Sequence, residues 1–279
     1  MIKPCCQNEA LRNEWDRTRA DADGVCVWWL GQSGYLLQSG GERLLLDPYL
    51  SDSLTVKYAS TDKPHVRISE RVIAPELITG LTAITSSHNH TDHLDAETLI
   101  PLRKGNPQAR LVIPEANRGF VNERLKTVDS GAIGLNAGER VELGGFVVHA
   151  VPAAHEELET DSLGRHRYLG YVIETGGRSI YHAGDTVRYP GMESWLGRWR
   201  LDLALLPING RLPARRVSGN LWGREAAQLA HDLGVKRTVP CHYDLFAFNT
   251  VTTEEFETEC RALDLPYQVL RLGEGLRVG

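Results

Sequence analysis

The residues with the clearest chemistry lie in one short stretch, residues 88–95. Its potential metal ligands are His88, His90, Asp92 and His93. An apolar run typical of a strand, residues 81–85, comes just before it, so the loop is expected at a sheet edge. Two histidines spaced by one residue can face one ion, and the Asp–His pair a second; such ligands suit a divalent cation such as zinc. A solvated, histidine-rich loop is the alternative, disfavoured because three of ten histidines fall within six positions.

One loop cannot fill two metal sites, so further ligands are expected elsewhere in the chain. Three candidates each follow an apolar run by a few residues: His155, Asp185 and His242. If these runs are strands whose carboxyl ends meet at a common sheet edge, the three side chains lie close to the histidine-rich loop.

The elements that must position these residues follow from hydrophobic patterning. Short apolar runs bounded by glycine-containing turns predict strands at residues 25–30, 35–38, 43–46, 78–85, 110–113, 140–143, 146–151, 168–174, 178–182, 201–206, 237–240 and 267–272. Amphipathic spacing predicts helices at residues 8–19, 96–103 (capped by Asp95), 115–126, 192–199, 224–233 and 253–263. The order strands, strand–helix, hairpins, strand–helix occurs twice. We therefore expect one α+β domain over residues 1–279, with two sheets packed face to face and helices outside.

Two segments stand apart from this pattern. Residues 1–22 are expected to form an N-terminal helical extension, which residues 21–24 end. Residues 50–75 lose periodicity, and a connection of this length is typical of a functional lid or an ordered surface loop.

Composition excludes several classes of function. A formal charge of −5 offers no broad basic field for nucleic acid. The apolar runs are shorter than the roughly 20 residues of a membrane helix, and we see no secretory segment. The odd cysteine count of five is typical of reduced thiols. We expect a cytoplasmic protein with a small-molecule substrate and no stable membrane insertion; homo-oligomer formation is left open.

The ligand pattern resembles the metallo-β-lactamase superfamily from about residue 46 to His242, which is most of the chain. The resemblance implies a four-layer αβ/βα sandwich that binds two divalent metal ions. One ion would be held by His88, His90 and His155, and the other by Asp92, His93 and His242. Asp185 would bridge the two ions, and Asp47 resembles the buried carboxylate that orients a ligand histidine in this family.

Four motifs look like the ascorbate-6-phosphate lactonase-like branch of the superfamily. They lie at residues 29–34, 88–95, 207–211 and 242–246. This branch lies near the phosphodiesterases that cleave N-acyl phosphatidylethanolamines.

The chemistry of such a site favours hydrolysis. Two divalent cations, Asp92, Asp185 and a bridging hydroxide leave a net charge of about +1, which favours an anionic substrate. Hydroxide would attack a carbonyl carbon or phosphorus, with Asp92 orienting it and passing a proton to the leaving oxygen. A lactone or ester of a small, phosphorylated sugar-like acid is the first expectation. A phosphodiesterase and a non-catalytic, metal-stabilised member of the fold are the alternatives. Zinc is favoured, although such ligands also accept manganese or iron.

Substrate contacts are expected from residues near these motifs. The candidates are Arg211 and Asn209 at the rim of the cleft, Tyr243 as an oxyanion donor, and His166 within a second basic patch. Arg215 and Arg216 lie in the same irregular segment after residue 206 and are also expected at the rim. A solvated surface position is the alternative for each of the three arginines. His65 is expected to be exposed, whereas His149 and His182 fit either packed sheet positions or support for the site.

Overall fold

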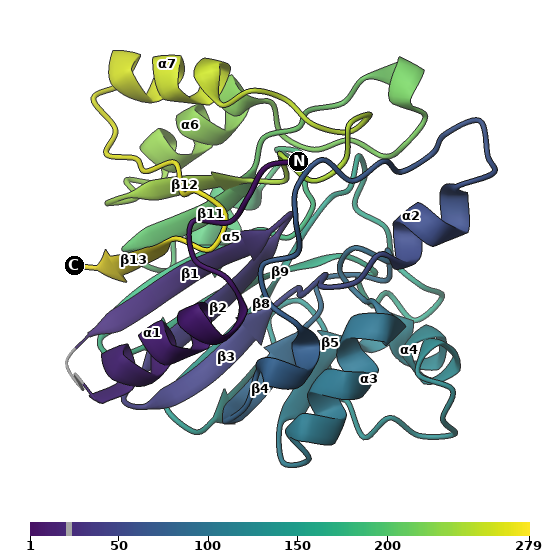
Figure 1. Cartoon of the computed structure of the whole chain (residues 1–279). Coiled ribbons are helices and arrows are strands. Elements are labelled where there is room, and N and C mark those ends of the chain that lie inside the picture. Colours follow the sequence, from purple (N-terminus) through teal and green to yellow (C-terminus); the bar gives the residue numbers. More distant parts are fainter. Residues whose placement is uncertain (21–23) are drawn as a thin grey trace.

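The computed structural model describes residues 1–20 and 24–279 and shows two mixed β-sheets packed face to face, with helices on their outer faces (Figure 1). The expected α+β sandwich is confirmed. Residues 21–23 lie outside the described residues. They include most of the predicted helix-ending turn and the end of the predicted extension.

The first sheet combines an antiparallel meander with parallel strands, in the order β13-β1-β2-β3-β4-β5-β6. Its strands are β1 (Val25–Gly31), β2 (Gly34–Ser39), β3 (Glu42–Leu46), β4 (Leu81–Thr85), β5 (Arg110–Pro114), β6 (Ile133–Leu135) and β13 (Gly275–Val278). Pairing is antiparallel from β13 to β3 and parallel from β3 to β6.

The second sheet repeats this plan in the order β12-β11-β10-β9-β8-β7. Its strands are β7 (Arg140–Leu143), β8 (Phe146–Pro152), β9 (Leu169–Thr175), β10 (Arg178–His182), β11 (Leu203–Pro207) and β12 (Thr238–Cys241). The run from β7 to β10 is antiparallel, and β10, β11 and β12 are parallel. The doubled order expected from the sequence is therefore present.

Helices cover both outer faces. They are α1 (Asn8–Ala20), α2 (Ser53–Tyr58), α3 (Ala96–Gly105), α4 (Arg118–Arg124), α5 (Met192–Leu196), α6 (Gly223–Asp232) and α7 (Glu254–Ala262). Figure 1 shows α1 and α3 outside the first sheet, and α6, backed by α7, outside the second. Among the residues described, no helix combines the length and apolarity needed to cross a membrane.

Helix α1 packs on the first sheet through its predicted apolar face. Leu11 and Trp15, four residues apart, are both fully buried. Polar contacts flank this face, because Arg43 donates to Asp16 at 2.6 Å and Trp28 donates to Glu14 at 2.8 Å. The helix is thus joined to the sheet by both apolar packing and polar contacts.

Two expectations about elements are wrong. The last strand is Gly275–Val278, not residues 267–272; within the latter, only Tyr267 forms a bridge, to Thr238. Gly273, at φ +83°, turns the chain, and the following residues then pair with β1. Residues 50–75 also contain a helix, α2, that no periodicity indicated.

Candidate metal centre

Five strands end at one edge of the two sheets, and each leads directly into the site. The residues concerned are Asp47 after β3, residues 88–93 after β4, His155 after β8, Asp185 after β10 and His242 after β12. β3 and β4 are parallel neighbours, as are β10, β11 and β12, and β8 runs in the same direction as β10. The candidate ligands therefore come from both sheets.

The histidine-rich loop is held at both ends and along its length. Asp95 caps α3 by accepting from the Thr98 N–H at 3.0 Å, as expected. Within the loop, Leu94 N–H donates to His90 O at 2.8 Å. Arg124 Nη1 donates to the carbonyl oxygens of Leu94 and Asn89, at 2.8 and 3.0 Å. The loop's side chains are thus aimed by a fixed backbone.

Three histidines form the first candidate group. The nearest ring nitrogens of His88, His90 and His155 lie within 4.8 Å of one another. In two of the rings, the nitrogen farther from the site, Nδ1, is hydrogen-bonded to other residues. His155 Nδ1–H donates to Gly219 O, and His88 Nδ1–H donates to Ser87 Oγ, both at 2.9 Å. These bonds leave the Nε2 lone pairs facing the site.

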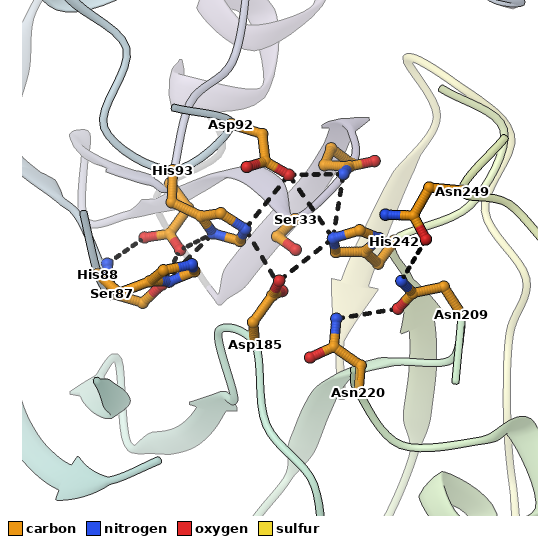
Figure 2. Close-up of polar contacts among 12 residues, drawn as sticks. Ser33, Ser87, His88, Asp92, His93, Asp185, Asn209, Asn220, His242 and Asn249 are labelled. Carbon is orange, nitrogen blue, oxygen red and sulfur yellow. Dashed lines mark hydrogen bonds and ion pairs between the residues drawn. The ribbon is translucent and has the colours of Figure 1, made fainter. Parts of the chain in front are cut away.

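Asp92, His93 and His242 form the second group, and Figure 2 shows Asp185 in contact with both of its histidines. Asp185 Oδ1 is 3.3 Å from His93 Nε2, and Asp185 Oδ2 is 3.3 Å from His242 Nε2. From the first group, His155 Nε2 lies 3.5 Å from Asp185 Oδ2. One carboxylate therefore reaches both sets of ligand atoms.

These separations fit metal coordination better than hydrogen bonding. Bonds of about 2.1 Å in a tetrahedral site place neighbouring ligand atoms about 3.4 Å apart. The second group matches this spacing, because Asp92 Oδ2 lies 3.6 Å from the Nε2 atoms of both His93 and His242. His88 Nε2, His93 Nε2 and Asp185 Oδ1 are buried without a hydrogen-bond partner, which is costly unless a cation binds them.

Electrostatics prepare His88, His90 and Asp185 for a cation. Burial lowers the pKa of His88 well below its ordinary value and that of His90 to about 4, with repulsion from neighbouring histidines adding to the effect. Burial alone would raise the pKa of Asp185, but His242 and His93 lower it well below its ordinary value. At neutral pH, the lone pairs of His88 and His90 are free and Asp185 is ionised.

Asp47 lies behind the ligands and is fully buried. Its Oδ1 accepts from Ser87 N–H at 2.8 Å. Its Oδ2 accepts from His93 Nδ1–H at 2.7 Å and from the Ser87 hydroxyl. This carboxylate orients His93 directly and His88 through Ser87.

Gln32 is a site residue that the sequence reasoning missed, although it lies in the quoted motif at residues 29–34. Its Nε2 lies 2.8 Å from Asp92 Oδ2 and 3.0 Å from His242 Nε2. Its backbone oxygen accepts from His242 N–H at 3.0 Å, which ties the β1–β2 turn to the last ligand. The sequence signal that could have indicated Gln32 is a polar residue in a tight turn between two apolar strands.

A cleft of about 520 Å³ opens over the ligands. One wall is aromatic, formed by Tyr58, His65, Phe246 and Phe248, whose rings contact one another. The charged residues of the lining, apart from histidines, are Lys57, Arg124, Arg216, Asp92 and Asp185. In the described structure the two carboxylates in the lining are thus both candidate ligands, and three cations stand around them.

Four residues that were expected to contact the substrate do not line the cleft. Arg211 forms two 2.7 Å bonds with Glu225 and faces a neighbouring depression. His166 bonds through Nδ1 to Asn136 Oδ1, outside the cleft lining. The Tyr243 hydroxyl donates to Leu270 O at 2.9 Å, so its proton is not available as an oxyanion donor. Asn209 is buried behind the cleft.

Three further histidines can also be placed relative to the site. His65 was expected to be exposed, but it is half-buried in the cleft wall, with its ring stacked on Tyr58 at 4.2 Å. His149 pairs with Glu174 away from the site, and His182 Nε2–H donates to Ser33 O at 2.8 Å. Of the arginines expected at the rim, Arg216 lines the cleft. The His65 error arose because its aromatic partners are distant in sequence.

A sandwich of two mixed sheets with a histidine- and aspartate-rich centre at their shared edge is the architecture of metal-dependent hydrolases of the β-lactamase fold. The family model for the β-lactamase superfamily domain matches residues 42–243. A UPF0173 metal-dependent hydrolase of Rubrobacter xylanophilus is 30% identical over 262 residues, covering 91% of this chain and 96% of that protein. The chain therefore belongs to the UPF0173 metal-dependent hydrolases of the metallo-β-lactamase superfamily.

Two further relatives agree. A UPF0173 metal-dependent hydrolase of Pyrobaculum arsenaticum is 28% identical over 241 residues, covering 85% of this chain and 92% of that protein. The solved structure of Igni18, a metallo hydrolase of Ignicoccus hospitalis, aligns with a TM-score of 0.65 at 22% identity. That alignment covers 91% of this chain and 98% of Igni18 and concerns the fold alone.

Proposed function

We propose that the protein is a dinuclear hydrolase acting on an ester or lactone of a small anionic acid. His88, His90 and His155 would hold one ion, Asp92, His93 and His242 the other, and Asp185 would bridge them. The observation that carries the proposal is the convergence of these seven side chains from both sheets at ligand spacing. Bound divalent ions would lower the pKa of water to about 7 and so supply hydroxide at neutral pH.

The chain's own residues would bind and orient the reactants. Asp92 would accept the hydroxide proton and pass it to the leaving oxygen. Lys57, Arg124 and Arg216 would attract an anionic substrate to the cleft. From the motifs, we predict that the protein belongs to the ascorbate-6-phosphate lactonase-like branch and hydrolyses a carboxylic ester.

A panel of sugar lactones, p-nitrophenyl acetate and bis-p-nitrophenyl phosphate tests the reaction class with zinc-, manganese- and iron-loaded protein. Turnover of lactones or esters is expected. Asp185→Ala should abolish it while the far-ultraviolet circular dichroism stays unchanged. Persistent turnover in Asp185→Ala would contradict the two-ion site.

A phosphodiesterase is the second candidate, and the aromatic wall favours it. An apolar entrance suits the acyl part of a phospholipid, and segment 50–75 contributes Tyr58 and His65 to this wall. Turnover of bis-p-nitrophenyl phosphate without any lactone or ester turnover would select this candidate. A non-catalytic member would turn over none of the panel in any metal form.

Metal identity is decided by elemental analysis of protein purified without added metal, where we expect two zinc ions per chain. One ion per chain would contradict the dinuclear site. Cytoplasmic residence remains a prediction, and homo-oligomer formation is left open.

A further inference from the structure

A row of three asparagines runs from the interior to the cleft (Figure 2). Asn220 Nδ2 donates to Asn209 Oδ1 at 2.9 Å, and Asn209 Nδ2 donates to Asn249 Oδ1 at 3.0 Å. Asn209 and Asn220 are buried, whereas Asn249 lines the cleft together with His242 and Asp185. The row therefore ends at the candidate metal centre.

Arg215 fixes the direction of this row. Its Nη1 lies 3.3 Å from Asn249 Oδ1, and the same guanidinium donates to the backbone oxygens of Asn209 and Thr250. A guanidinium can only donate, so the amide atom facing it must be the oxygen. Reversing the row would set the Asn249 NH₂ group against the guanidinium.

The remaining amide atom of Asn249, Nδ2, is therefore a donor. The contacts of Oδ1 with Asn209 and Arg215 fix its position. Figure 2 shows it on the side of the His242 ring. Within the described part of the chain, the amide's bonds all run through Oδ1, so Nδ2 has no acceptor. A fixed, unpaired donor beside the metal ligands is suited to an oxygen of a bound molecule.

We infer, on the basis of the proposed hydrolase function, that Asn249 is a catalytic residue that stabilises developing negative charge on the substrate. When hydroxide forms its bond to the scissile carbonyl carbon, the carbonyl electron pair moves onto oxygen, and Asn249 Nδ2–H donates to that oxygen. The pair returns as the bond to the leaving oxygen breaks, and that oxygen takes the proton held by Asp92. Asn249 donates a hydrogen bond and transfers no proton. Asn209 and Arg215 are positioning residues.

Asn249→Asp separates this role from a structural one. The substituted carboxylate still accepts from Asn209 and Arg215, but it presents an oxygen to the cleft in place of the donor. Asn249→Ala removes the donor without adding charge, and Ser218→Asp reports the effect of added negative charge on the same cleft. Loss of one oxyanion donor lowers kcat by about 10²–10³-fold.

With the zinc-loaded full chain, kcat for p-nitrophenyl acetate should fall about 100-fold in both Asn249 variants, with KM changed by less than about threefold. The dissociation constant for inorganic phosphate, measured by calorimetry, should rise about tenfold in Asn249→Ala. Zinc content and the melting temperature of Asn249→Asp should match the unsubstituted protein.

The outcomes distinguish the two proposals. If both Asn249 variants keep kcat within about threefold of the unsubstituted protein, or if Asn249→Ala binds phosphate as tightly, the donor role is overturned. If Asn249→Asp loses activity only as far as Ser218→Asp does and Asn249→Ala loses none, charge explains the loss and the donor role is again overturned. If the unsubstituted protein hydrolyses nothing in the panel while Asn249→Ala still binds phosphate more weakly, the hydrolase proposal and the catalytic role fail, and Asn249 is only a donor to a bound anion.

Discussion

Asp47 shows how one buried side chain organises several others. It accepts from His93 and from both the amide and the hydroxyl of Ser87, and it has no exposed surface. Residues that orient metal ligands in this way contribute about 10–100-fold to metal affinity. We therefore expect Asp47→Asn to weaken zinc binding by about that factor, measured by competition with a chelating dye. Asp202→Asn is the matched control.

Asp202 is a suitable control because it is also a buried carboxylate that accepts a backbone N–H, from Ser179 at 2.9 Å. It lies just before β11 and contacts none of the candidate ligands. Equal losses of zinc affinity in the two variants would mean that Asp47 acts through general stability rather than through His93.

Gln32 makes the two candidate groups unequal. Its amide nitrogen already contacts Asp92 and His242, whereas His88 Nε2 has no partner. An ion entering the second group must displace this amide, so we expect the three-histidine group to fill first. Gln32→Ala should strengthen the weaker zinc-binding step about tenfold, the value of one hydrogen bond. A two-step zinc titration measures this.

The half-buried Gln228→Ala on α6 serves as the control for that titration. It should change neither step, because among the described residues the Gln228 side chain bonds to Asp232 on the same helix and to no candidate ligand. Identical affinities for both ions before and after the Gln32 substitution would contradict the inequality.

At the residue scale, sequence reasoning worked where chemistry is local. The spacing of His88, His90, Asp92 and His93 predicted one metal-binding loop, and apolar runs predicted which strand ends would meet it. Contacts set by residues distant in sequence were not predictable. Asn249 faces the cleft only because Arg215 and Asn209 orient its amide, and Tyr243 turns away toward Leu270.

At the scale of elements, α1 is held against the first sheet by buried apolar side chains. Trp15 is fully buried against the first sheet and lies edge-on to Trp28, with ring centroids 6.2 Å apart. Truncation of a buried tryptophan costs about 3–5 kcal/mol. We expect Trp15→Ala to lower the free energy of unfolding by that amount in urea titrations.

Trp199→Ala is the matched comparison, because Trp199 is half-buried and contacts His149 on β8 of the second sheet. It should lower the free energy of unfolding by less than half as much. Equal effects would mean that α1 adds no packing beyond that of a surface element.

The segment between β3 and β4 shows where element prediction ended. The exposed Arg216–Asp62 ion pair joins it to the loop after β11, and a pair of this kind contributes little to stability because solvent screens it. The rings of Tyr58, His65 and Phe246 hold it more firmly. Because these rings meet only in the folded chain, no local pattern indicated α2. A role for this segment as a moving lid remains a prediction.

At the scale of the whole molecule, the candidate ligands join the two sheets. Residues 88–93 belong to the first sheet, whereas His155, Asp185 and His242 belong to the second. Ions bound only by the folded state would stabilise it by about 4 kcal/mol when free zinc is a thousand times the dissociation constant. Chelation should lower the free energy of unfolding by that amount.

Urea unfolding with and without a chelator measures this difference. Asp185→Ala should lose most of the response to zinc, while the exposed Glu97→Ala on α3 should keep it. Equal stability with and without metal in the unsubstituted protein would mean that the sheets are held by their core alone.

The overall architecture was the most predictable feature, because hydrophobic periodicity recurs in both halves of the chain. The pairing of distant strands was not predictable, since no local pattern indicates which strand pairs with β1 on the side opposite β2. That strand is β13, in which Val278 pairs with Val25.

This pairing has a consequence for biosynthesis. A ribosome releases β1 early, but its neighbour on one side is made only after the entire second sheet. Until then β1 has an open edge that invites pairing with other nascent chains. Completion of the first sheet is therefore a late event in folding, and chaperones that shield strand edges are most useful while the second sheet is being synthesised.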